Sequence, residues 1–234
     1  MPAVDEAIVL AGGFGTRLRA IVGSVPKPLA PVAGRPFLAW LLDRMARDGI
    51  RRCILATGYM ADSIEACIGE RWQGMDVIYS REDEPLGTGG AVRLAARRLL
   101  GCGVHVVNGD TWLEYAPSAL EEAALQSGVS LSIALAYVED VSRYGAVEVA
   151  GGRALAFHEK GSSGSGRINA GCYFLGEAAL SSLPTTSSFS FEHDVLQPRA
   201  AAGDVVAFEK TAGFIDIGVP EDYARAQLIF AERA

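Results

Sequence analysis

The sequence predicts an α/β protein with a doubly wound, mixed but mostly parallel sheet. Short apolar runs with the length of buried strands recur at residues 7–10, 53–57, 76–80 and 104–107. Between them lie stretches such as 37–45, in which apolar residues are spaced three and four apart as in a helix. Regular alternation of strand and helix favours parallel pairing, because each helix returns the chain to the same edge of the sheet.

The other elements are assigned from the same signals and from turn residues. A short helix capped by Asp62 or Ser63 is expected to run to Ile68. A second glycine cluster is expected to open a helix that reaches about Leu100. The later part of the chain predicts helices at 117–127, 192–202 and 220–233, strands at 129–137, 167–173 and 205–210, and an antiparallel pair at 146–149 and 154–159.

Bulk properties limit the classes of function. The 234 residues suit one sizeable domain or two small ones, and we expect a single domain over 1–234. Half of the residues are hydrophobic, as in ordinary globular proteins. The 28 Asp and Glu outnumber the 21 Lys and Arg, which gives a net charge of −7 and argues against non-specific binding to nucleic acid or to anionic membranes.

The start of the chain and its cysteines bear on location. Asp5 and Glu6 precede the first apolar run, unlike a signal peptide, and no apolar stretch approaches the length of a membrane span, so we expect a cytoplasmic protein. The four cysteines form no C-x-x-C pair, which favours small buried residues over a disulfide framework or a zinc site. They are Cys53, Cys67, Cys102 and Cys172.

The first predicted strand leads into a glycine-rich segment, LAGGFGTRLRAIVGSVPKPLAPV. Gly12, Gly13 and Gly15 allow a sharp turn and bring backbone N–H groups close to an anion. Arg17 adds positive charge, and Lys27 lies between two prolines that stiffen its backbone. This combination predicts a site for a phosphate-bearing ligand.

The glycine-rich segment has three other possible interpretations. A dinucleotide fingerprint needs a third glycine, but Leu18 stands in its place. A Walker loop needs Gly-Lys followed by Ser or Thr, and that tripeptide does not occur in the sequence. A glycine-rich turn without a ligand remains open from the glycines alone, although Arg17 and Lys27 make it less attractive.

The run AGGFGTRLR…PKPLAPVAGRPFL resembles the signature of the sugar-1-phosphate nucleotidyltransferases, which join a nucleoside monophosphate from an NTP to a sugar phosphate. The resemblance extends over the whole chain. It implies a Rossmann-like, GT-A-like fold with an antiparallel sugar-binding extension. Residues 1–137 would be mainly the nucleotide-binding half, and residues 138–234 mainly the sugar-binding half and the C-terminal helix. It also implies that the glycine loop wraps the triphosphate while Arg17, Lys27 and Arg19 neutralise it.

The second glycine cluster, PLGTGGA, would weaken the helix that it opens unless something needs close access to its backbone. A flat nucleobase is one such partner, and a flexible surface loop is the alternative. The segment resembles the family's base-binding loop and is most similar to that of guanylyltransferases. The predicted nucleotide site comprises Leu10, Ala11, Gly12, Gly13, Gly15, Thr16, Arg17, Lys27, Leu86, Gly87, Thr88, Gly90, Asn108 and Gly109.

Two aspartates are candidate ligands of Mg²⁺. Asp110 follows a buried strand at the edge where open α/β sheets bind ligands, and it lies too far before Pro117 to cap the next helix well. Asp216 lies between two isoleucines, where an unpaired carboxylate would be costly. Mg²⁺ prefers carboxylates together with substrate phosphates. The resemblance implies that both aspartates hold the metal.

The sugar side is predicted from residues that flank a GSSGSG loop at 161–166. The pattern E-K…N-A-G resembles the family's sugar-binding motif and places Glu159 on hydroxyl groups and Lys160 on the sugar phosphate. Many relatives have proline where this chain has Gly161, which leaves the stiffness of the loop in doubt. The predicted sugar-phosphate site is Tyr144, Gly145, Glu159, Lys160, Asn169 and Gly171, and the predicted catalytic set is Arg17, Lys27, Asp110, Lys160 and Asp216.

The segment FIDIGVPEDY is most similar to heptose 1-phosphate guanylyltransferases. The expected substrates are therefore GTP and D-glycero-D-manno-heptose 1-phosphate, and the product would supply a capsule or lipopolysaccharide. Mannose 1-phosphate with GTP and N-acetylmuramate 1-phosphate with a uridylyl donor remain as alternatives, as does a nucleotide-sugar-binding module without activity. The apolar stripe of Tyr223, Ala226, Ile229 and Phe230 fits either core packing or a homodimer face.

Overall fold

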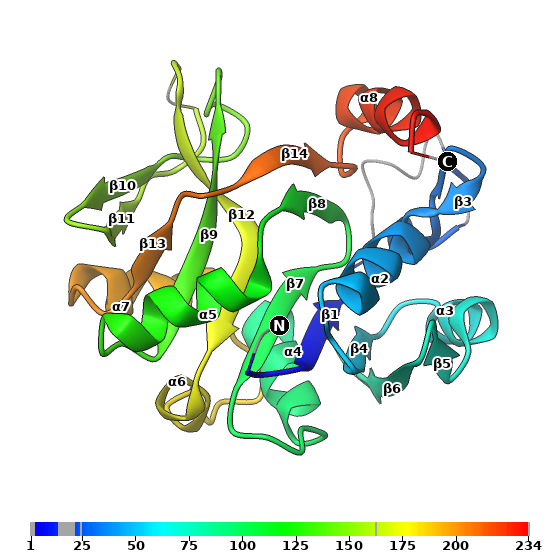
Figure 1. Ribbon diagram of the computed structural model, residues 1–234, viewed down its shortest axis with the longest axis horizontal. Helices are drawn as coiled ribbons and strands as arrows, with labels where there is room; N and C mark the ends of the chain where they lie inside the picture. Colours follow the sequence, from blue (N-terminus) through cyan, green and yellow to red (C-terminus); the bar gives the residue numbers. More distant parts are fainter. Residues whose placement is uncertain (1–2, 14–21, 24, 162, 234) are drawn as a thin grey trace.

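The computed structural model describes residues 3–13, 22–23, 25–161 and 163–233. Ten of the described strands form a mixed sheet in the order β10-β11-β13-β9-β12-β7-β1-β4-β6-β5 (Figure 1). Its strands are β1 (Glu6–Leu10), β4 (Arg52–Thr57), β5 (Arg71–Trp72), β6 (Met75–Arg81), β7 (Val104–Asn108), β9 (Leu131–Val138), β10 (Val147–Ala150), β11 (Arg153–Phe157), β12 (Gly166–Leu175) and β13 (Val206–Phe208).

Parallel pairing dominates one side of this sheet. Strand β1 pairs in parallel with both β4 and β7, and β4 pairs in parallel with β6. The other side is largely antiparallel, since β12 runs opposite to both β7 and β9, and β10 runs opposite to β11. The α/β class and the mixed sheet predicted from the sequence are confirmed.

The helices lie on both faces of the sheet, as in a doubly wound fold (Figure 1). The face that carries Ala7 and Val9 packs against α2 (Phe37–Arg47), α3 (Ala61–Ile68) and α5 (Pro117–Gln126). The opposite face carries Ile8 and packs against α4 (Gly87–Ala96), α6 (Glu177–Ser181) and α7 (Gln197–Ala201). Successive side chains of β1 therefore enter different cores, which explains why its sequence is apolar without interruption.

A third hydrophobic core lies beside the main sheet and joins residues 30–40 to the last helix. It is built from the hairpin of β2 (Pro31–Val32) and β3 (Arg35–Pro36), the pair of β8 (Thr111–Glu114) and β14 (Ala212–Asp216), and the helix α8 (Pro220–Ala231). The ring of Phe230 packs edge-on against Trp112, with 4.9 Å between the ring centroids. Phe230 and Ala226 are fully buried, so half of the predicted stripe on this helix is core, whereas Tyr223 and Ile229 are only partly covered.

Several element boundaries differ from the sequence prediction. The helix α3 has no side-chain cap from Asp62 or Ser63, because the chain enters it through Met60 in the left-handed conformation, with φ 57°. Helix α4 ends at Ala96, before Leu100, whose N–H is accepted by the buried carboxylate of Glu6. The helix predicted over 192–202 begins instead as a π-helix, η2 (Glu192–Leu196), and continues as α7.

Cys53 and Cys172 are buried as predicted, but Cys67 and Cys102 are exposed, and all four thiols are free. Among the described helices, none has both the length and the apolar character that crossing a bilayer requires.

The packing of Phe230 predicts that Phe230→Ala lowers the free energy of unfolding by about 3–5 kcal/mol, because a large side chain is removed from a closed core. Chemical denaturation measures this change. Leu228→Ala on the same helix is the control, since Leu228 is 73% exposed and its loss should change stability by less than about 0.5 kcal/mol. Equal effects of the two variants would contradict the role of α8 in this core.

Candidate active site

A cavity of about 330 Å³ opens at the carboxyl ends of β1, β4 and β7. This is the edge at which open α/β sheets bind ligands. Most residues of the predicted nucleotide site line it: Leu10, Ala11, Gly12, Gly13, Lys27, Gly87, Thr88 and Asn108. The predicted metal ligand Asp110 lines it as well. Pro28, Ala56, Glu82, Pro85 and Ala91 complete the lining. Gly15, Thr16, Arg17 and Arg19 lie outside the described residues.

Lys27 reaches this cavity from a short 3₁₀ turn, η1 (Lys27–Leu29). Pro26 precedes the turn and Pro28 lies within it, and the N–H of Leu29 closes it on the Pro26 carbonyl at 2.8 Å. The stiffened segment that the two prolines predict is therefore present. Only 16% of the Lys27 side chain is exposed, which places its ammonium group in a partly dehydrated setting.

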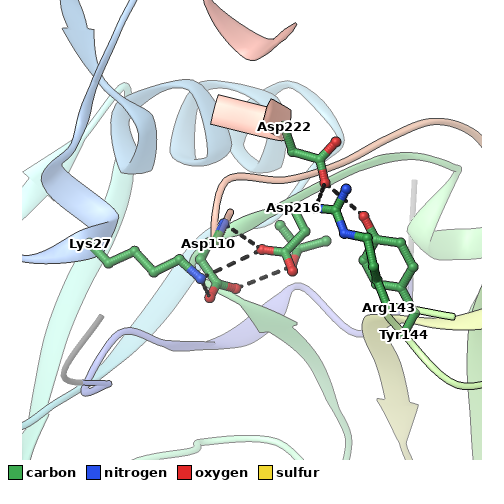
Figure 2. A network of polar contacts seen from close by, with 8 residues as sticks. Lys27, Asp110, Arg143, Tyr144, Asp216 and Asp222 are labelled. Carbon is green, nitrogen blue, oxygen red and sulfur yellow. Dashed lines mark hydrogen bonds and ion pairs between the residues drawn. The ribbon is translucent and has the colours of Figure 1, made fainter. Parts of the chain in front are cut away.

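The ammonium group of Lys27 lies between the carboxylates of Asp110 and Asp216 (Figure 2). It forms a hydrogen-bonded ion pair with Asp110 Oδ2 and lies 3.5 Å from Asp216 Oδ1. The two aspartates are 106 positions apart in the sequence (216 − 110), yet a single cation contacts both. The two candidate metal ligands therefore meet in space, although their role toward Mg²⁺ stays a prediction.

Strand pairing explains how these aspartates meet. Strand β14 runs antiparallel to β8, and this register places Asp216 opposite Thr111, the neighbour of Asp110. The N–H of Ile217 also donates to the Asp110 carbonyl at 3.0 Å. Each carboxylate has a further donor, since Thr111 Oγ1 bonds Asp110 Oδ1 at 3.1 Å and the Gly218 N–H bonds Asp216 Oδ1 at 2.7 Å.

The charge balance at this site favours a cation. Burial raises the pKa of Asp216, the nearby negative charge of Asp110 raises it further, and Lys27 opposes both effects. Within the described part of the chain, no group of three or more His, Cys, Asp or Glu side chains could enclose a metal ion. Two carboxylates beside an open cavity do suit Mg²⁺, which commonly takes one or two carboxylates and completes its shell with phosphate oxygens and water.

The glycines of the predicted base-binding loop are required by a neighbouring segment of the same chain. A side chain at Gly89 would collide with the ring of Phe189, and one at Gly87 with the Phe189 carbonyl. The same carbonyl accepts the N–H of Gly89 at 3.0 Å, while Thr88 Oγ1 accepts the N–H of Phe191 at 3.0 Å. The prediction that another group lies close to this backbone is confirmed. At Gly87 and Gly89, however, that group is Phe189 of the same chain.

Among the described residues, three members of the predicted nucleotide site do not line the cavity. Gly90 packs against Ser187. The Gly109 N–H donates to the carbonyl of Leu10, the last residue of β1, at 2.9 Å. The backbone N–H of Leu86 donates to Glu82 at 3.0 Å. These residues support the loops around the cavity. The sequence alone did not distinguish residues with this structural role from residues that line the cavity.

The predicted sugar side divides into exposed and internally bonded groups. Glu159 and Lys160 are exposed just beyond the end of β11. Asn169 is already engaged, because its Nδ2 donates to Glu192 at 2.9 Å and its Oδ1 accepts the hydroxyl of Tyr173 at 3.0 Å. Gly171 lies against the Asn108 side chain and so joins this strand to the nucleotide cavity.

Tyr144 and Gly145, which the sequence analysis placed at the sugar site, have clear internal contacts. The Tyr144 hydroxyl donates to Asp222 Oδ2 at 2.7 Å, and Gly145 packs against the His158 carbonyl. His158 is exposed, and its Nε2 lies 3.5 Å from Glu148 Oε2, consistent with its interpretation as a surface residue. His193 is also exposed and contacts Gln197.

Sequence reasoning missed Glu82, Glu192 and Asp222. Glu82 stands in an acidic run that looks like an exposed turn, yet its carboxylate lines the cavity. Burial raises its pKa, and the hydrogen bond from Leu86 opposes that rise. Glu192 gives no local signal, because its partner Asn169 lies 23 positions away.

Comparison with known proteins decides the family. Residues 6–233 match the nucleotidyl transferase family. The chain belongs to this family. The family membership predicted from the glycine-rich signature is thus confirmed.

Relatives match this nucleotidyl transferase over nearly its whole length. D-glycero-alpha-D-manno-heptose 1-phosphate guanylyltransferase of Aneurinibacillus thermoaerophilus is 39% identical over 95% of the chain and 96% of its own length. The enzyme with the same name from Campylobacter jejuni is 35% identical over 93% of the chain and 96% of its own length. The crystal structure of HddC from Yersinia pseudotuberculosis complexed with GMP-PN is 36% identical, with a TM-score of 0.86 over 97% of the chain and 100% of the HddC chain.

Gly218 provides a test of the Lys27–aspartate geometry. A Cβ at Gly218 would lie 2.7 Å from Asp216 Oδ1 and closer still to Lys27 Nζ. Gly218→Ala should therefore displace both charged groups and lower turnover about 100-fold, as expected for misplacement by about 1 Å. Pyrophosphate release measures turnover. Gly176→Ala is the control, because the nearest atoms to its Cβ are at an ordinary 3.6 Å, and full activity of Gly218→Ala would contradict the need for this arrangement.

Proposed function

We propose that this nucleotidyl transferase moves GMP from GTP to D-glycero-α-D-manno-heptose 1-phosphate and releases pyrophosphate. The observation that carries the proposal is the meeting of Asp110 and Asp216 around Lys27 at the rim of the glycine-lined cavity. The choice of substrates rests on the two heptose 1-phosphate guanylyltransferases that match nearly the whole chain. The HddC complex with GMP-PN supports a guanine nucleotide.

The reaction would need no covalent intermediate and no general base. An oxygen of the sugar phosphate is already anionic and attacks the α-phosphorus of GTP in line. The bond between that phosphorus and the oxygen leading to the β-phosphorus breaks, and pyrophosphate leaves with the electron pair. The protein then has to supply position and positive charge. Lys27 would contact the reacting phosphates, and Arg17 and Arg19 would neutralise the departing pyrophosphate.

Asp110 and Asp216 would hold Mg²⁺ in this proposal. Both carboxylates contact the same ammonium group beside the cavity. Burial and then the negative charge of Asp110 raise the pKa of Asp216, and a further cation would offset both effects. When bound, the ion would act as a Lewis acid toward the phosphate oxygens. Lys27 would then shift from the carboxylates toward the phosphates, since its ammonium group sits on four flexible methylenes.

Glu82 is the group best suited to select guanine. Its Oε2 accepts the Leu86 N–H, and its carboxylate lines the cavity beside Gly12, Pro85 and Gly87. Guanine presents two adjacent donors on its Watson–Crick edge, the ring N1–H and the exocyclic amino group. An ionised carboxylate accepts both, whereas adenine offers an acceptor at the ring position and would be rejected.

The remaining expectations concern the sugar and the setting. Glu159 would contact sugar hydroxyls, and the exposed Lys160 would meet the incoming phosphate. We also propose a cytoplasmic enzyme whose GDP-heptose feeds a capsule or lipopolysaccharide. A homodimer stays a prediction.

A pyrophosphate-release panel tests the function. Four NTPs are combined with heptose 1-phosphate, mannose 1-phosphate and N-acetylmuramate 1-phosphate, and GTP with the heptose phosphate should give the highest kcat/KM. Asp110→Asn should lower this activity by at least about 100-fold, as for loss of one electrostatic contact to the transition state, with the fold intact by circular dichroism. Pyrophosphate release from no pair would overturn the proposal, and a preference for another pair would reassign the substrates.

The proposed contact of Glu82 predicts a change in base selectivity. Wild-type protein should prefer GTP over ITP, which lacks the exocyclic amino group, by about tenfold or more, because a hydrogen bond to a charged acceptor is lost. Glu82→Gln should reduce this preference while KM for sugar phosphate stays unchanged. Glu84→Gln is the matched control, since Glu84 is exposed on the same turn. Loss of selectivity in the Glu84 variant alone would move the assignment away from Glu82.

A further inference from the structure

The exposed Glu159 and Lys160 depend on a turn that lies beside them in space. The N–H of His158 donates to the Ala146 carbonyl at 2.8 Å, and the N–H of Gly161 donates to the Ser142 carbonyl at 2.9 Å. Gly145 packs so closely on the His158 carbonyl that a side chain there would collide with it. We call residues 142–161 the sugar-side arm. Its turn supports the backbone that presents Glu159 and Lys160.

A single buried carboxylate connects this arm to the last helix (Figure 2). Asp222 lies in the first turn of α8 and is only 5% exposed. Its Oδ2 accepts the Tyr144 hydroxyl at 2.7 Å and an N–H of the Arg143 guanidinium at 3.2 Å. Arg225, on the same helix, pairs with Oδ1 at 3.3 Å.

The helix end that carries Asp222 is also tied to the strand of Asp216. The ring of Tyr144 packs edge-on against Phe214 of β14, with centroids 5.4 Å apart. Arg225 donates to the Phe214 carbonyl at 2.9 Å. Asp222 therefore joins the arm to the strand whose end supplies one of the two central carboxylates.

The helix itself does not depend on Asp222 for its place in the fold. Phe230 and Ala226 anchor α8 in the third core, and both are fully buried. Loss of the Asp222 contacts should therefore release the arm and leave the helix packed. Burial raises the pKa of Tyr144, and its bond to Asp222 raises it further, so the phenol stays protonated and remains a donor.

We propose that Asp222 is a positioning residue that holds the sugar-side arm in register with Asp216, so that Lys160 faces the attacking phosphate. This inference rests on the proposed function for the role of Lys160. Asp222 does not line the nucleotide cavity, so its effect on sugar phosphate passes through Tyr144, Arg143 and the backbone of the arm. Binding of GTP is independent of it.

Steady-state kinetics separates this role from a general structural one. Asp222→Asn keeps the shape of the side chain but removes its charge, and should raise KM for sugar phosphate about tenfold, the loss expected for hydrogen bonds to a charged group. KM for GTP should not change. Glu221→Gln is the matched control, because Glu221 is the adjacent acid, its side chain is 77% exposed and it lies 3.9 Å from Arg143. A rise in both KM values, or an equal effect of Glu221→Gln, would overturn the proposal.

Tyr144→Phe then tests the route through which Asp222 acts. If the Tyr144 hydroxyl works through Asp222, the double variant with Asp222→Asn should be no worse than the more affected single variant. Additive effects on KM would instead show that the hydroxyl binds the sugar directly, and the proposed route would be wrong. Lys160→Ala provides the reference for complete loss of the phosphate contact.

Amide hydrogen exchange provides a readout that needs no turnover. In Asp222→Asn, the amides of His158 and Gly161 should exchange faster, while those of β1 and β7 keep their protection. Unchanged exchange in the arm would overturn the proposal. An inactive wild-type protein would refute the proposed function but leave this exchange result to decide whether Asp222 holds the arm.

Discussion

Two carboxylates that share one ammonium group form the electrostatic centre of this molecule. Asp110 and Asp216 would repel each other in a partly buried setting, and Lys27 compensates for that repulsion. The three side chains come from a strand end, a second small sheet and a proline-braced turn. The fold must hold all three segments in place before the charges can balance, so the site and the third hydrophobic core are built from the same pieces.

The burial of the Asp216 carboxylate lowers the free energy of unfolding, which suits a binding site. A carboxylate whose pKa is raised by burial prefers its protonated form, so ionised Asp216 detracts from stability at neutral pH. Because folded Asp216 keeps its proton to a higher pH than it does in the unfolded chain, the free energy of unfolding falls as the pH rises through the raised pKa of Asp216. A bound cation would offset this effect, because it would stabilise the ionised carboxylate.

One segment, residues 189–192, contacts two parts of the predicted site. Phe189 packs against Gly87 and Gly89 of the predicted base-binding loop, and three positions later Glu192 accepts a hydrogen bond from Asn169 on the predicted sugar strand. The π-helix that begins at Glu192 widens the first turn at this junction. Internal contacts of this segment thus join the predicted nucleotide side to the predicted sugar side.

Local sequence determined the elements and most of the nucleotide site. Apolar runs bounded by glycine and proline predicted β1, β4 and β7 to within one or two residues, because buried parallel strands carry an uninterrupted apolar signal. Lys27 and Asp110 were found for the same reason, since each stands beside a local signal of its own. The glycine-rich signature identified the family. The second glycine cluster, however, could not separate a glycine that lines the cavity, Gly87, from one that packs against the chain itself, Gly90.

Only the tertiary structure decided what distant segments do to one another. Strand β12 inserts beside β7 and brings the predicted sugar strand against the centre of the sheet, although Gly166 at the start of β12 lies 58 positions (166 − 108) after Asn108 at the end of β7. Asp222 looked like an ordinary acidic residue in the first turn of a helix, because nothing near it in sequence reveals Tyr144 as its partner. Helix periodicity and turn chemistry act over a few residues, but the pairing of a buried charge depends on which surfaces the folded chain brings together.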